Sequence, residues 1–345
     1  MKKVALNASY RSTLELRTEA KIQNYQLVEF KEFFCNPSEI NKHNMENGFM
    51  RVIVPVDGGR DCREAIRFIA SKKEWFEQEK PEVELVYVQK PIVERATEQA
   101  EFDMGAYYEA RSKAVWSGMR EEIDAIPGDV KKTSLVGHPA QVIPQYANEQ
   151  KADLIVMGAR GLSALQNLYL GSVSLATIAS SKCPVLVFRQ TTEVKPSGLH
   201  VGLSVDDSPF GPKCADYLIA HRHFFGKDAT FEIINVVPDD PLYAPDFVNE
   251  GPIPPQMTWE EIQGLEFEAS VKSPVEKFDI AGVPVKAVKL IGNPEDVLPK
   301  YADEHLDVMV MGTHGKGALR SLVFGSSTRA MIAATNLPIL VVPNV

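Results

Sequence analysis

The second half of the chain repeats the first, and this duplication constrains the fold more than any other feature. An apolar run that ends in an acidic turn lies at residues 51–58 and again at 199–208. Four more matched pairs follow in the same order at a nearly constant separation, namely 83–88 with 230–237, 136–139 with 291–294, 152–158 with 306–312 and 183–188 with 337–342. Five correspondences in one order predict a duplicated domain.

Within each half, the short apolar runs alternate with segments of helical periodicity. Helical spacing of apolar residues covers 61–75 and, in the second half, 212–224. A second pair of helices is predicted at 140–150 and 295–305, each after a Gly-x-Pro turn. Thr258 with Glu261 is a capping box that predicts the start of another helix. Alternating buried strands and helices indicate βαβ units with a parallel sheet.

The predicted fold class is therefore α/β, with two tandem, doubly wound, Rossmann-like domains of five parallel strands each. We place domain 1 at residues 51–192 and domain 2 at 198–345, after an N-terminal extension at 1–50. The extension carries a broken apolar stripe that fits either an added packing element or a mobile arm. Two unlike loops, at 89–107 and 238–257, are predicted to flank the ligand edge of the sheets as lids or as exposed tethers.

Composition and charge exclude several classes of function. The chain has 37 Lys and Arg residues against 46 Asp and Glu residues, a net charge of −9. Such a surface repels nucleic acid, although local backbone N–H groups can still hold one anionic ligand. The four cysteines are scattered without metal-ligand spacing, which is typical of a reducing cytoplasm. No apolar run approaches the roughly 20 residues that span a bilayer, and the N-terminus lacks a secretion signal. We expect a cytoplasmic protein with no membrane or nucleic-acid partner.

A glycine pattern follows the fourth predicted strand of each half. The pattern is G-x2-G-x9-G-[ST], and it begins at Gly158 and again at Gly312. A strand that ends in Gly lets the backbone turn sharply and approach a ligand closely. The later Gly-[ST] opens an apolar helix, whose free N–H groups and positive dipole end attract an anion. The pattern predicts a polyphosphate site in each half, and the alternative is that these glycines serve only turns and helix caps.

An acidic residue ends the first predicted strand of each half. These residues are Asp57 and Asp206. The carboxyl ends of strands form the ligand crevice of an open α/β sheet, so either carboxylate is placed to bond a ribose hydroxyl or an adenine amine. The alternative is a turn or helix N-cap aspartate, and one residue can serve both roles.

Taken together, these residues resemble the universal stress proteins, in a tandem two-domain form of the ATP-binding branch. The resemblance covers about residues 50–345 and rests on both copies of the glycine pattern. It implies a first pocket lined by Val56, Asp57, Val88, Gly158, Arg160, Gly161, Gly171, Ser172, Val173 and Ser174. It implies a second pocket lined by Val205, Asp206, Val236, Gly312, His314, Gly315, Gly325, Ser326, Ser327 and Thr328.

The same resemblance implies a bound adenine nucleotide, ATP with ADP or AMP as alternatives, and Mg²⁺ carried by the nucleotide rather than by a metal site of the protein. It also implies pairing through the last strand of each domain, at 185–188 and 339–342, within one molecule or in a homodimer. Arg160 in the first copy is His314 in the second, so the first loop carries the permanent charge.

No catalytic constellation is visible in the sequence. There is no Walker A lysine, and neither Ser172 nor Ser326 has a base nearby in sequence. We therefore expect no enzyme but an ATP-binding stress-response regulator with an unknown protein partner. One alternative is a nucleotide-independent scaffold that binds partners or an apolar ligand. A remote alternative is an ATP pyrophosphatase-like enzyme, because residues 57–62 distantly resemble its SGGxDS loop.

Overall fold

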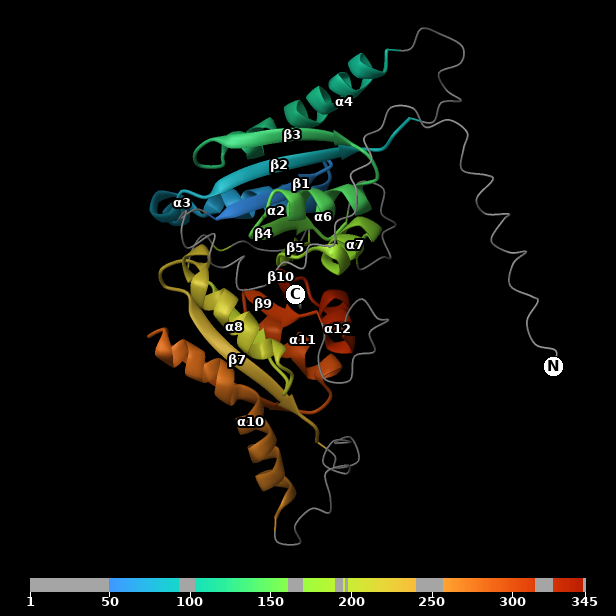
Figure 1. Cartoon of the computed structure of the whole chain (residues 1–345). Helices are drawn as coiled ribbons and strands as arrows, with labels where there is room; N and C mark the ends of the chain where they lie inside the picture. Colours follow the sequence, from blue (N-terminus) through green and yellow to red (C-terminus); the bar gives the residue numbers. More distant parts are fainter. Residues whose placement is uncertain are drawn as a thin grey trace, which may run out of the picture. The chain divides into compact units, whose positions relative to one another are not determined.

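The computed structural model describes residues 50–92, 103–160, 170–189, 195, 198–239, 257–313 and 325–343. The N-terminal extension and most of both long loops lie outside these residues, so the predictions made for them stay open. Figure 1 shows the arrangement of the helices and strands that are described below and labels most of them.

The first half contributes five strands to the sheet. They are β1 (Arg51–Val56), β2 (Glu82–Gln89), β3 (Val130–Val136), β4 (Leu154–Gly158) and β5 (Val185–Phe188). The second half contributes β6 (His200–Ser204), β7 (Thr230–Val237), β8 (Val285–Ile291), β9 (Val308–Gly312) and β10 (Ile339–Val342). Within each half all pairings are parallel, and the order in the first is β3-β2-β1-β4-β5. The second half has the matching order β8-β7-β6-β9-β10. The predicted α/β fold class is confirmed.

The two half-sheets join through their last strands into one ten-stranded sheet. Strands β5 and β10 pair antiparallel, with Leu186 opposite Leu340. This is the intramolecular pairing that the resemblance implied, and it covers two strand edges that would otherwise be open to another chain. An aromatic cluster also crosses the junction, because Phe68 and Trp75 lie 5.6 and 5.1 Å from Phe224, measured between ring centroids.

Helices cover both faces of the sheet, because side chains of successive strand residues point to opposite sides. The helical elements of the first half are α2 (Arg60–Ser71), α3 (Lys73–Glu79), α4 (Met104–Gly118), α5 (Arg120–Asp124), α6 (Pro139–Glu149) and α7 (Ser172–Ser180). Those of the second half are α8 (Phe210–Ala220), η2 (Arg222–Phe225), α10 (Trp259–Ile280), α11 (Pro294–His305) and α12 (Ser326–Ala334). One apolar core takes residues from α2, α3, α5, α8, η2 and α10, and the other takes residues from α6, α7, α11 and α12.

Local sequence signals explain three of the helix starts. The Thr258–Glu261 capping box is present at α10, and Pro139 and Pro294 open α6 and α11. The helix predicted over 61–75 differs from the structure, because it breaks at Lys72 into α2 and α3. The break brings Trp75 into the core, where it is 2% exposed.

Candidate functional site

The predicted ligand edge lies where the strand order reverses in each half. Strand β1 pairs with β2 on one side and β4 on the other. The chain leaves β1 into α2, which belongs to one core, and leaves β4 toward α7, which belongs to the other. Crossovers to opposite faces open a crevice between the carboxyl ends of two such strands. The second half repeats this arrangement at β6 and β9.

The helix that follows the glycine pattern is tied directly to the strand before it. The backbone N–H of Gly171 donates to the carbonyl oxygen of Ala159 (N···O 2.7 Å), and the N–H of Gly325 donates to Thr313 (3.0 Å). Gly171 and Gly325 are the N-caps of α7 and α12, and neither offers a side chain to cap the first turn. A helix without such a cap presents unpaired N–H groups at its positive end. Both halves therefore present the same anion-attracting geometry.

The side chains around these two helix starts divide into two groups. Ser172 and Ser326, the first residues of α7 and α12, are exposed. The hydroxyl of Ser174 instead donates to the carbonyl oxygens of Gly158 and Ala159, at 2.9 and 3.0 Å. These hydrogen bonds join α7 to the end of β4, so the Ser174 hydroxyl has a structural role.

Gly158 is required by the packing of the protein itself. A Cβ atom at this position would lie 2.7 Å from the carbonyl carbon of Asp61 and from the backbone nitrogen of Cys62. Real Cβ atoms do not approach backbone this closely, so α2 can rest on the end of β4 only where β4 ends in Gly. The sequence predicted a close approach of Gly158 to a ligand, whereas the close approach in the structure is to helix α2.

Both strand-end aspartates form turns. The Oδ1 atom of Asp57 accepts the N–H of Gly59 (2.8 Å), and that of Asp206 accepts the N–H of Ser208 (3.1 Å). This is the turn role that the sequence left as an alternative. Both residues remain half-buried at the ligand edge.

The four predicted valines lie at or next to the ends of β1, β2, β6 and β7, but they pack in different cores. Val56 and Val205 pack in one core, while Val88 and Val236 pack with the other. Val173 and Ser327 lie in the first turns of α7 and α12. Gly312 ends β9 and accepts the hydroxyl of Thr328 (3.2 Å), while Gly161, His314 and Gly315 lie outside the described residues.

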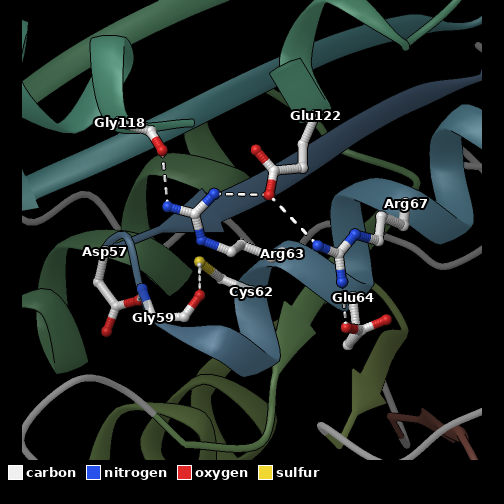
Figure 2. A network of polar contacts seen from close by, with 8 residues as sticks. All are labelled: Asp57, Gly59, Cys62, Arg63, Glu64, Arg67, Gly118 and Glu122. Atoms are coloured by element: carbon white, nitrogen blue, oxygen red, sulfur yellow. Dashed lines mark hydrogen bonds and ion pairs between the residues drawn. The ribbon is translucent and has the colours of Figure 1, made fainter. Parts of the chain in front are cut away.

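A polar network beside Asp57 was missed by the sequence analysis (Figure 2). Arg63 pairs with Glu122 (2.5 Å) and donates to the carbonyl oxygen of Gly118 (2.7 Å), while Arg67 also approaches Glu122 (3.4 Å). Burial by itself raises the pKa of Glu122, but the hydrogen bond from Arg63, a backbone hydrogen bond and the charges of Arg63 and Arg67 together outweigh it and hold the pKa below its usual value. The network joins α2 to the end of α4 and to α5.

A second missed feature is the ion pair between Asp61 and Arg160. The Oδ2 atom of Asp61 accepts the backbone N–H of Arg160 at 3.1 Å and lies 3.4 Å from its Nε. Asp61 is only 5% exposed. Arg160 was expected to offer its charge to phosphate, and the structure gives that charge a carboxylate partner within the protein.

A duplicated polar cluster lies toward the other end of the strands. Buried Glu84 accepts the hydroxyl of Tyr146 (2.6 Å) and pairs with Lys131 (3.0 Å). In the second half, Glu232 does the same with Tyr301 (2.6 Å) and Lys286 (3.1 Å). The repetition of a glutamate within an apolar strand was visible in the sequence. Because each carboxylate accepts hydrogen bonds from several side chains of the protein itself, we assign the cluster a structural role.

The cysteines offer no nucleophile in the described part of the chain. Cys62, Cys183 and Cys214 are buried and unpaired. Burial raises the pKa of each thiol to about 12, so each stays protonated at neutral pH. The described residues also contain no group of three or more His, Cys, Asp or Glu side chains placed to hold a metal ion. None of the described helices is long and apolar enough to cross a membrane.

Comparison with known proteins identifies the family. The model of the universal stress protein family matches residues 48–189 and 200–343. A universal stress protein of Thermus aquaticus is 47% identical over 73 residues, which are 21% of this chain and 53% of that protein. The chain thus aligns with about half the length of this relative.

One solved structure supports the fold, and a second is that of a similar family member. A universal stress protein from Archaeoglobus fulgidus has a TM-score of 0.57 at 19% identity, covering 85% of this chain and 96% of that one. A family member from Arabidopsis thaliana, solved with AMP bound, has a TM-score of 0.29 at 18% identity, covering 43% of this chain and 98% of that one. With both halves matched by the family model, this chain belongs to the universal stress protein family.

Proposed function

We propose that this chain is an adenine-nucleotide-binding regulator of a stress response, with one nucleotide site in each half. The sites lie at the carboxyl ends of β1 and β4 and of β6 and β9. The observation that carries the proposal is the duplicated helix start, where an uncapped first turn is held against the preceding strand through Gly171–Ala159 and Gly325–Thr313. Such a turn offers several N–H donors and a positive dipole end to phosphate.

The described residues fit the phosphate end of a nucleotide. A phosphate would accept from the first N–H groups of α7 or α12, with the exposed hydroxyl of Ser172 or Ser326 as a further donor. Mg²⁺ would arrive with ATP, held by phosphate oxygens and water. No base or nucleophile emerges from the described residues, so the proposed role is binding rather than catalysis.

Regulation would work through the two long loops, whose arrangement would depend on whether nucleotide is bound. Loops 89–107 and 238–257, described only at their ends, connect strands to helices at the ligand edge. A ligand that binds one arrangement of these loops better shifts the population toward it and presents that surface to a protein partner. The three unpaired, buried cysteines support our proposal of a cytoplasmic location. Because β5 and β10 already pair within the chain, a homodimer would use another surface.

The experiment that tests the proposal places a carboxylate at the anion site. In Ser172→Asp, the new carboxylate takes the N–H groups of the first turn of α7 and repels phosphate, while the helix gains about 0.3–1 kcal/mol from its dipole. The variant should therefore lose nucleotide binding in the first half without losing stability. Ser326→Asp is the matched variant in the second half, and Ser172→Asn is the uncharged control. Calorimetric titration with AMP and with Mg-ATP should give two sites for wild type, one for each Asp variant and none for the double variant. Two sites in the double variant would reject the assignment.

A nucleotide-independent scaffold is the second candidate. It is favoured by the structural roles of Gly158, Ser174 and Thr328, each of which makes a contact that the protein needs for its own packing. The same titration separates the two candidates, because a scaffold gives no nucleotide binding in any variant. The ATP pyrophosphatase alternative gains nothing from the structure: Cys62 stands where that loop carries a serine, and its buried thiol donates to Gly59.

A further inference from the structure

We propose that the two sites prefer different numbers of phosphates, and that Asp61 causes the difference. The first half would select AMP over ATP, and the second half would bind ATP at least as well as AMP. This inference rests on the proposed function and names the ligand preference of those same sites.

The first step is the position of the Asp61 carboxylate. Its Oδ2 accepts from the backbone N–H of Arg160 and lies 3.4 Å from the Nε of that residue. Arg160 follows Ala159, whose carbonyl oxygen accepts the N–H of Gly171 at the start of α7. The carboxylate thus bonds the residue that directly follows Ala159, whose contact with Gly171 positions the proposed phosphate site.

The second step is what this carboxylate does to a bound phosphate. A phosphate bound beside Arg160 would be a second anion that accepts hydrogen bonds from this residue. Asp61 already takes the backbone donor and pairs with the guanidinium, so it acts as a built-in competitor. Each further phosphate adds negative charge near a carboxylate that is 5% exposed, where water and salt screen repulsion poorly.

The third step is the asymmetry between the halves. Asp57 and Asp206 correspond at the ends of β1 and β6, and at the same spacing Phe210 stands where the first half has Asp61. The buried positions of α2 and α8 follow this alignment, because Cys62 and Ala65 match Gly211 and Cys214. A phenyl ring accepts no backbone N–H, so Phe210 itself cannot compete with phosphate as the Asp61 carboxylate does. The additional acid of the second half, Asp207, is exposed on the turn, where solvent screens it.

The test measures each site alone. In a Ser326→Asp background only the first site binds, and in a Ser172→Asp background only the second does. Calorimetry with AMP and with ATP, each with and without Mg²⁺, gives the AMP-to-ATP affinity ratio of each site. We expect the first site to favour AMP about tenfold more strongly than the second, the size of one charge-assisted hydrogen bond. Asp61→Asn should remove most of this difference, because the amide still accepts the Arg160 N–H but carries no charge.

Phe210→Asp in the second half is the reciprocal variant, and it should shift that site toward AMP. Thermal unfolding of each variant shows whether the fold survives, and Asp61→Ala is the alternative if the Asn variant does not fold. Equal ratios at the two sites, or a ratio unchanged by Asp61→Asn, would overturn the inference alone. Loss of ATP binding in Asp61→Asn only when Mg²⁺ is present would also overturn it, because Asp61 would then be a metal ligand. Absence of any adenine-nucleotide binding by wild type would instead reject the proposed function.

Discussion

The hydroxyl of Ser174 donates to the carbonyl oxygen of Gly158 at 2.9 Å and so ties the first turn of helix α7 to the end of strand β4. The same bond occurs in the second half, where Thr328 donates to Gly312 at 3.2 Å. In each half, a hydroxyl residue two positions beyond the repeated glycine pattern therefore donates to the first glycine of that pattern. This contact fixes the helix start against the strand end, which is the relationship on which each proposed site depends.

Removing the Ser174 hydroxyl should weaken the attachment of helix α7 to strand β4. Ser174→Ala leaves the helix intact but deletes the bonds to Gly158 and Ala159, and we expect a loss of about 1 kcal/mol in the free energy of unfolding. Nucleotide affinity in the first half should fall because the first turn of α7 is less firmly held. Urea unfolding and calorimetry measure the two effects. Ser172→Ala, at an exposed position in the same turn, is the control and should leave stability within about 0.5 kcal/mol.

Gly158 should tolerate no side chain. Gly158→Ala would place a methyl group 2.7 Å from the backbone of Asp61 and Cys62, and we expect a loss of about 1–3 kcal/mol from this overpacking. Gly118→Ala is the matched control, because a Cβ atom there meets nothing within 4 Å. The urea midpoint should fall for Gly158→Ala and stay near that of wild type for Gly118→Ala. Equal stability of Gly158→Ala and wild type would show that α2 does not rest on β4 as described.

The Glu84 cluster should make stability depend on acid pH. Burial by itself raises the pKa of Glu84, but hydrogen bonds from Thr133, Tyr146 and Lys131 outweigh it and hold the pKa below its usual value. Its contribution is therefore present above about pH 4.5 and is lost as the pH falls through the lowered pKa. Tyr146→Phe should cost about 1–3 kcal/mol at pH 7 and less at pH 3.

Unfolding of the Tyr146→Phe variant and wild type at both pH values gives this comparison. Tyr301→Phe should reproduce it at Glu232, whose pKa is lowered in the same way by Tyr301 and Lys286 against the effect of burial. A difference that stays constant from pH 7 to pH 3 would mean that the tyrosine acts only by packing.

His221 provides a second pH dependence, at the junction of the halves. Its ring contacts that of Tyr217 at a tilt of 47°, and the Tyr217 hydroxyl lies 3.4 Å from the carbonyl oxygen of Asp153 in the first half. Burial lowers the pKa of His221 to about 4, whereas an unfolded histidine titrates near 6.5. Between these values only the unfolded chain binds the proton, so stability is complete above about pH 6.5 and falls toward pH 4.

We expect this loss to be about 3 kcal/mol, and His221→Phe should flatten the stability curve over that range. His305→Phe removes an exposed imidazole from a similar ring contact with Tyr301 and should keep the wild-type slope. A His221→Phe curve parallel to that of wild type would contradict the assignment.

The sequence was most informative where the repeat and the periodicity act together. Runs such as Val52 to Val56 are apolar on both faces of the sheet, which predicts central parallel strands covered on two sides. The Thr258–Glu261 capping box and the prolines of α6 and α11 are local signals that need no tertiary context.

The contacts missed by the sequence analysis are non-local. Asp61 and Arg160 are 99 residues apart, and they meet only because β1 pairs with β4 in a particular register. The break at Lys72 depends on the pocket that receives Trp75, so helical spacing alone does not predict it. In the same way, the glycine pattern predicts that some group lies close to Gly158. The structure is needed to identify that group as α2.

The central claim is one adenine-nucleotide site in each half, and counting bound nucleotide tests it most directly. Native mass spectrometry of the intact chain, titrated with AMP and separately with Mg-ATP, resolves chains that carry none, one or two nucleotides. Our account predicts saturation at two per chain for wild type, at one for Ser172→Asp or Ser326→Asp, and none for the double variant. A wild-type chain that carries no nucleotide at saturating concentrations of both ligands would contradict it.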